Sequence, residues 1–65
     1  MVFQAHQIRV VGEKFDLDER LEKLGAFLKT DTFKDLDIAE QARLHRQQAL
    51  MAALSSVLGE RIAAF

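Results

Sequence analysis

Apolar residues recur every three or four positions over residues 4–29, which is the spacing of one face of an α-helix. The clearer of two overlapping stripes has the intervals of a seam between packed helices and consists of Leu17, Leu21, Leu24 and Leu28. The other stripe precedes it and consists of Ile8, Val11 and Phe15. The pattern therefore predicts one long amphipathic helix over about residues 4–29.

The N-terminal part of this segment admits a second interpretation. Residues 2–11 could form a strand that ends at Gly12, followed by a helix that starts at Asp16 with Glu19 completing a capping box. Apolar and polar residues do not alternate cleanly from Ala5 to Val11, however, and a single strand would have no partner in the chain. We favour the continuous helix and keep the strand as the alternative.

A second helical pattern covers about residues 38–63, and its apolar arc is unusually wide. The main stripe consists of Leu44, Met51, Leu54, Leu58, Ile62 and Phe65. Leu50, Val57 and several alanines lie beside the stripe, and the only polar residues from Ala49 to Leu58 are two serines. One partner helix cannot cover such an arc, so the pattern predicts a second buried face against another subunit.

The segment of residues 30–37 separates the two patterns and carries helix-start signals. Thr32 with Asp35, and Asp37 with Glu40, each place a capping residue three positions before a carboxylate. These pairs predict a capped turn with two helix starts. The whole chain, residues 1–65, is therefore expected to be a single all-α domain, an antiparallel two-helix hairpin that assembles into a homo-oligomeric helical bundle.

The same connector contains two apolar residues, Phe33 and Leu36, three positions apart. This spacing predicts one helical turn that places an aromatic ring under the closed end of the hairpin. We interpret Phe33 as a hydrophobic plug and not as part of a binding site.

Length and composition support self-association. A chain of 65 residues in two helices buries little surface alone, and the absence of cysteine excludes a disulfide framework. The net charge of -1 excludes the global basic field that drives non-specific DNA binding. No apolar run approaches the roughly 18 residues that span a bilayer, and the N-terminus lacks the pattern of a signal peptide. We therefore expect a cytoplasmic protein with no membrane and no DNA partner.

Catalytic and metal chemistry are not expected. His6 and His45 lack the carboxylate spacing that would complete a metal site, and no cofactor motif is present. Ser55 and Ser56 lie in the most apolar stretch, where helix packing with a hydrogen bond to a backbone carbonyl explains them. The sequence therefore predicts a protein that is not an enzyme.

Charged residues are unevenly distributed along the chain, and the segments with net positive charge contain the candidate binding residues. Residues 13–37 hold eight acids and five bases, whereas the outer segments are each net positive. Arginine presents a planar fork that suits phosphate or carboxylate. The candidate ligand-binding residues are Arg9, Arg43, His45, Arg46, Gln47 and Arg61, with Gln48 beside them. We expect the arginines to hold phosphates, and the histidine and glutamines to contact base or ribose, if oligomerisation brings the arginines together.

One set of positions follows a recognisable pattern: Arg9-Val10-Val11, Glu13-Lys14, Leu17-Asp18, Leu21, Lys23-Leu24, Phe27, Phe33, Leu36, Gln41, Leu44, Gln48, Met51, Leu58 and Arg61-Ile62. With these positions the chain resembles a widespread group of small phage-encoded helical-hairpin proteins. The matching positions cover nearly the whole chain and are largely structural. At Ala52 to Leu54 the sequence departs from the pattern, which has an aromatic residue after the methionine.

The resemblance implies a phage accessory protein in the cytoplasm of an infected bacterial host. Small oligomeric helical proteins of phages include counter-defence sponges that sequester the nucleotide signals of bacterial immunity. By this analogy the expected function is sequestration of a small anionic, nucleotide-like ligand without catalysis. The alternative is a helical adaptor or inhibitor that binds a host or phage protein through the acidic face of residues 13–22 or the alanine-rich arc.

Overall fold

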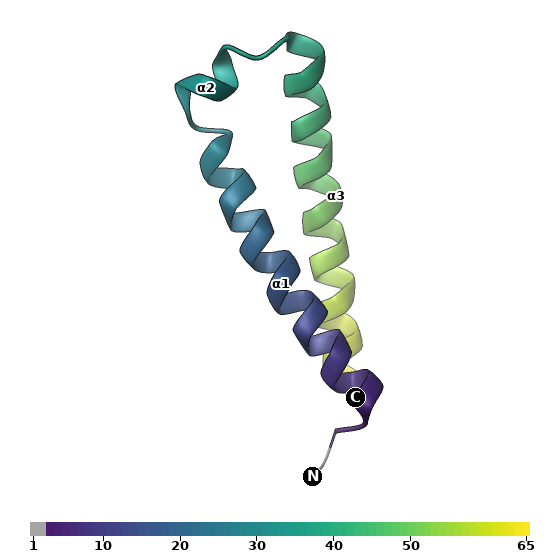
Figure 1. Cartoon of the computed structure of the whole chain (residues 1–65). Helices are drawn as coiled ribbons and strands as arrows, with labels where there is room; N and C mark the ends of the chain where they lie inside the picture. The colour runs from purple at the N-terminus through teal and green to yellow at the C-terminus, as the bar shows by residue number, and fades with distance from the viewer. Residues whose placement is uncertain (1–2) are drawn as a thin grey trace.

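A computed structural model describes residues 3–65 as an antiparallel helical hairpin (Figure 1). Its elements are α1 (Ala5–Phe27), the short α2 (Asp31–Lys34) and α3 (Ile38–Ala63). The predicted all-α hairpin is confirmed, with helix boundaries close to those expected. The strand interpretation of residues 2–11 is wrong from Ala5 onward, where the backbone is helical, and Val2 lies outside the described residues.

The core of the hairpin lies where α1 and α3 pack together. Val10, Leu17 and Leu58 form a buried cluster, against which Met51 and Ile62 pack. Leu58 is only 1% exposed, so it is the most deeply buried of these side chains. The start of α1 and the end of α3 lie at the same end of the hairpin (Figure 1), where the rings of Phe3 and Phe65 meet edge to face at 5.9 Å.

The connector is closed by α2 and its aromatic residue. Phe33 is 6% exposed, and its ring meets the rings of Phe27 at 6.1 Å and His45 at 5.3 Å, both edge to face. The predicted helical turn is present, and the ring is buried as a hydrophobic plug would be. Such edge-to-face pairs add about 0.5–1.5 kcal/mol beyond the area that they bury.

The capping residues differ from those predicted. The hydroxyl of Thr30, not that of Thr32, accepts a hydrogen bond from the backbone N–H of Phe33 at 3.2 Å. Thr30 also donates to the carbonyl of Phe27 at 2.6 Å, so one side chain ends α1 and begins α2. The prediction of a Thr32 cap is wrong because α2 starts at Asp31, two positions before the start at Phe33 that a Thr32 cap would require.

Asp37 occupies the N-cap position of α3, as predicted, but its side chain makes no capping hydrogen bond. The expected partner Glu40 instead pairs with Arg43, Oε1 to Nε at 2.8 Å. The connector is held to α3 by Gln41, whose amide donates to the carbonyls of Lys34 at 3.0 Å and Leu36 at 2.9 Å. The capping box of residues 37–40 is therefore absent, and a glutamine closes the turn.

Two apolar surfaces remain exposed on the single chain. On α1 the predicted stripe of Ile8, Val11 and Phe15 does not reach the core. On α3 the uncovered residues are Leu50, Leu54 and Val57, the part of the wide arc that α1 does not cover. The predicted oligomer thus remains a prediction, for which a single chain leaves apolar surface available. Within the described residues, no helix combines the length and apolarity needed to cross a bilayer.

Candidate anion-binding groove

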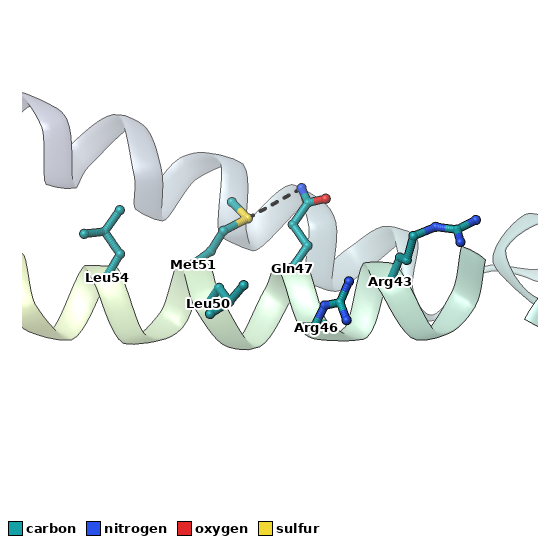
Figure 2. A pocket seen from close by; sticks show the side chains of 6 residues that line it. All are labelled: Arg43, Arg46, Gln47, Leu50, Met51 and Leu54. Atoms are coloured by element: carbon teal, nitrogen blue, oxygen red, sulfur yellow. Dashed lines mark hydrogen bonds between the residues drawn. The ribbon is translucent and has the colours of Figure 1, made fainter. Parts of the chain in front are cut away.

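An open groove of about 420 Å³ runs along one face of α3 (Figure 2). The residues that line it are Arg43, Arg46, Gln47, Leu50, Met51 and Leu54. They recur every three or four positions, so one helix places all six side chains on neighbouring rows of its surface. From the first to the last, the groove extends roughly 16 Å along the helix axis. Its volume falls in the usual range of small-molecule sites.

The groove has a polar end and an apolar end. Arg43, Arg46 and Gln47 form the polar end, nearest the connector, whereas Leu50 and Leu54 lie at the other. Figure 2 shows Gln47 reaching along the groove, where its amide donates to Met51 Sδ at 3.8 Å. A site of this kind offers cationic forks for an anion beside an apolar wall that excludes water from one side.

The two arginines differ in their partners. Arg43 is paired through Nε with Glu40, so its other nitrogen atoms remain available as donors. Arg46 has no ion pair within the described part of the chain. A guanidinium group carries five N–H donors in a planar fork and one positive charge. The polar end can therefore donate several hydrogen bonds to one anion.

The other predicted site residues lie elsewhere in the single chain. His45 faces the ring of Phe33 at the connector, and Gln48 lies near Gly25 in the interface between the long helices. Arg9 and Arg61 are at the opposite end of the hairpin, with Arg61 roughly 22 Å along α3 from Arg46. The hairpin thus brings together Arg43, Arg46 and Gln47, but it does not bring Arg9, His45 or Arg61 to them.

A second polar cluster joins α1 to α3. Lys14 Nζ lies 2.8 Å from both Asp18 Oδ2 and Ser55 Oγ, and the Ser55 hydroxyl donates to the Asp18 carboxylate. The expectation that Ser55 bonds to its own helix is wrong, because its partners lie on α1. The signal for this cluster was present in the spacing: Lys14 falls between Val10 and Leu17 on the inward stripe.

The cluster is a cross-link between helices and is not arranged like a nucleophilic site. Serine activated by lysine needs a neutral amine that accepts the hydroxyl proton. Here Lys14 is the donor to Ser55, and the serine donates onward to Asp18. The hydrogen bonds from Lys14 and Ser55, with the Lys14 charge, lower the pKa of Asp18 below its usual 3.8. The carboxylate is thereby kept ionised as the acceptor of the cluster.

A metal site finds no support in the described residues, where no group of three histidine or acidic side chains lies close enough to share an ion. The chemistry that the groove offers is donation of hydrogen bonds to a negatively charged group. It carries no nucleophile and no carboxylate in its lining.

Comparison with models of protein families gives a match over nearly the whole chain. The model of a family described as Sequestin matches residues 4–64, which is almost the entire hairpin. No curated protein and no solved structure matches the chain.

Proposed function

Because the chain belongs to the Sequestin family, we propose that it sequesters a small anionic ligand of the nucleotide class in the groove of α3. The family name is consistent with a sequestering role, in which binding itself is the activity. The phage setting and the identification of the ligand as an immune signal are parts of this proposal, drawn from the resemblance to phage hairpin proteins.

The observation that carries the proposal is the placement of two arginines and a glutamine beside an apolar wall. Arg43 and Arg46 donate to the phosphate oxygens, and Gln47 donates to or accepts from the base or ribose. Leu50 and Met51 shield one side of these contacts from water, which strengthens hydrogen bonds between charged groups. A protein that only binds needs no further chemistry at this site.

Isothermal titration calorimetry tests the proposal with cyclic di-AMP, cyclic AMP, ADP-ribose and inorganic pyrophosphate as probes. At least one nucleotide is expected to bind with micromolar or tighter affinity, and more tightly than pyrophosphate, since pyrophosphate lacks the base and ribose. The absence of heat for every probe at millimolar concentration would remove the proposed function.

The arginine contribution has a matched control on the other helix. Arg46→Gln should weaken binding by about 10-fold or more, because a hydrogen bond to a charged group contributes about 1.5–3 kcal/mol. Arg20→Gln removes the same charge from α1, and Arg20 does not line the groove. Equal loss of affinity in both variants would mean that net charge, and not the groove, attracts the ligand.

A protein partner is the competing function, and one observation favours it. Phe15 is 69% exposed on α1, next to the exposed Ile8 and Val11, so this helix also presents apolar surface. A stoichiometric protein complex that forms equally well when Arg43 and Arg46 are both replaced by glutamine would support the adaptor function.

A further inference from the structure

The helix α3 carries two stripes with the intervals of a helix–helix seam. The inner stripe, which faces α1, is at least partly buried and consists of Leu44, Gln48, Met51, Ser55, Leu58 and Ile62. The outer stripe has the same four-three repeat, is exposed throughout, and consists of Arg43, Gln47, Leu50, Leu54, Val57 and Arg61. At its centre Leu50, Leu54 and Val57 are 64%, 44% and 48% exposed. A seam with arginines at its ends and aliphatic residues at its centre has no partner in the chain.

We propose that this outer stripe packs antiparallel against the same stripe of a second copy, and that Arg61 of the second copy completes the anion site of Arg43 and Arg46. The second part rests on the proposed function, whereas the pairing of the helices stands on the stripe alone. The two halves of the site, separated by roughly 22 Å in one chain, then meet across the interface.

Charge complementarity selects both the occupant and the register. Beside the outer stripe, Arg46, Ala53 and Glu60 form a row with seven-residue spacing. When two α3 helices run antiparallel with the two-fold axis near residue 52, Leu50 of each copy faces Leu54 of the other. In the same register, the row beside the stripe lies against the same row of the second copy. Arg46 of each copy then lies opposite Glu60 of the other, which gives two ion pairs, and Ala53 lies opposite Ala53. If one helix is shifted by seven residues along the other, both Arg46–Glu60 ion pairs are lost. The charges therefore favour a second copy of this chain as the partner, in this one register.

The ends of this seam explain why an anion belongs there. In the same register Arg43 faces Arg61 of the second copy, and like charges at such a position repel each other. An anionic group between the two guanidinium groups removes the repulsion and receives hydrogen bonds from both chains. The second copy also covers Leu50 and Leu54 and so encloses the apolar end of the groove, leaving the polar end open. Ligand binding and pairing are therefore coupled, and each strengthens the other.

Single cysteines test the pairing, because the native chain has none. Ala53→Cys should form a cross-linked dimer with a short bismaleimide, since its position meets its own copy at the two-fold axis. Ala52→Cys is the matched control, because Ala52 is also exposed but points about 100° away around the helix. Ala39→Cys lies on the same row as Ala53 but beyond the end of an antiparallel partner, so it should not react with its copy.

Two results would overturn the pairing. Cross-linking of Ala52→Cys as efficiently as Ala53→Cys would mean that this face is not the interface. Cross-linking of Ala39→Cys would show parallel helices. Circular dichroism should show that each variant keeps its helicity, which removes unfolding as the cause of a negative result.

Charge exchange tests the register independently. Arg46→Glu and Glu60→Arg should each weaken the dimer in analytical ultracentrifugation, and the double variant should restore it, because the ion pairs are re-formed with opposite sign. Failure of the double variant to recover the dimer, with helicity intact, would contradict the register.

The contribution of Arg61 is measured with ADP-ribose and pyrophosphate as probes. Arg61→Gln should keep or tighten the ligand-free dimer, since it removes the repulsion from Arg43, but should weaken probe binding about 10-fold or more. Arg20→Gln, which removes the same charge from α1 outside the groove, is the control and should bind as wild type. Probe binding that is unaffected by Arg61→Gln would overturn the shared site.

The two proposals fail in distinguishable ways. A wild-type chain that binds nucleotide while Ala53→Cys stays monomeric would retain the proposed function and overturn the pairing. A chain that cross-links at Ala53 but binds no probe would retain the pairing and overturn the ligand and the role of Arg61.

Discussion

Asp18 is the residue that ties the chemistry of α1 to that of α3. Its carboxylate accepts hydrogen bonds from Lys14 one turn before it and from Ser55 on the facing helix. Lys14 and Asp18 remain partly solvated, with side-chain exposures of 29% and 44%, so their ion pair alone adds little stability. The main effect of the Asp18 carboxylate is to provide a hydrogen-bond acceptor for Lys14 and Ser55, whose polar groups would otherwise face an apolar seam.

The cluster predicts a specific pH dependence of unfolding. Because the folded state lowers the pKa of Asp18 below 3.8, the stability that it contributes is complete above that value and is lost as the pH falls through the folded pKa. The difference in unfolding free energy between wild type and Asp18→Asn should therefore be largest near about pH 6 and shrink toward about pH 3.

Urea unfolding followed by circular dichroism at several pH values measures this difference. Asp16→Asn is the control, because the side chain of Asp16 makes no ion pair and no hydrogen bond with the described residues. A difference for Asp18→Asn that stays constant across this pH range would show that the cluster does not hold the carboxylate in its ionised form.

At the scale of elements, the connector ends α1, forms the short helix α2 and leads into α3. Thr30 bonds to both helices that it separates, and Phe33 fills the space under the closed end. The sequence predicted the helical turn and the buried ring from the spacing of Phe33 and Leu36. It identified the wrong capping threonine, because the pattern of a carboxylate three positions later selects Thr32, whereas α2 starts at Asp31 and Thr30 is its cap.

The two threonines give a matched pair of variants. Thr30→Ala should lower the free energy of unfolding by about 1 kcal/mol, the usual effect of losing a capping hydroxyl. This corresponds to a fall of about 4–8 °C in the melting temperature of a domain of this size. Thr32→Ala removes an exposed hydroxyl that makes no capping bond and should change it little. Equal effects in thermal unfolding, or a larger effect at Thr32, would contradict the assignment of the cap.

At the scale of the whole molecule, the hairpin could be predicted because each helix carries a local repeat and the turn is short. The inward face could not be fully assigned, since the stripe with Ile8 and Phe15 is as apolar as the one that is buried. The binding site, too, could be predicted from the sequence only in part. Arg43, Arg46 and Gln47 meet through helical spacing on one element, which a sequence reveals. Whether Arg61 joins these three residues depends on how copies of the chain assemble, and the spacing of residues along one helix does not reveal that assembly.

The groove of α3 is proposed to hold an anionic nucleotide, and the most direct test is to locate where the nucleotide binds on the chain. Titration of the isotope-labelled protein with ADP-ribose, followed by two-dimensional NMR, reports each backbone amide of this 65-residue chain separately. The largest shifts are expected within residues 43–54, with Arg61 responding as the contribution of a second copy. Shifts confined to α1, or no shifts at millimolar ADP-ribose and cyclic di-AMP, would contradict the account.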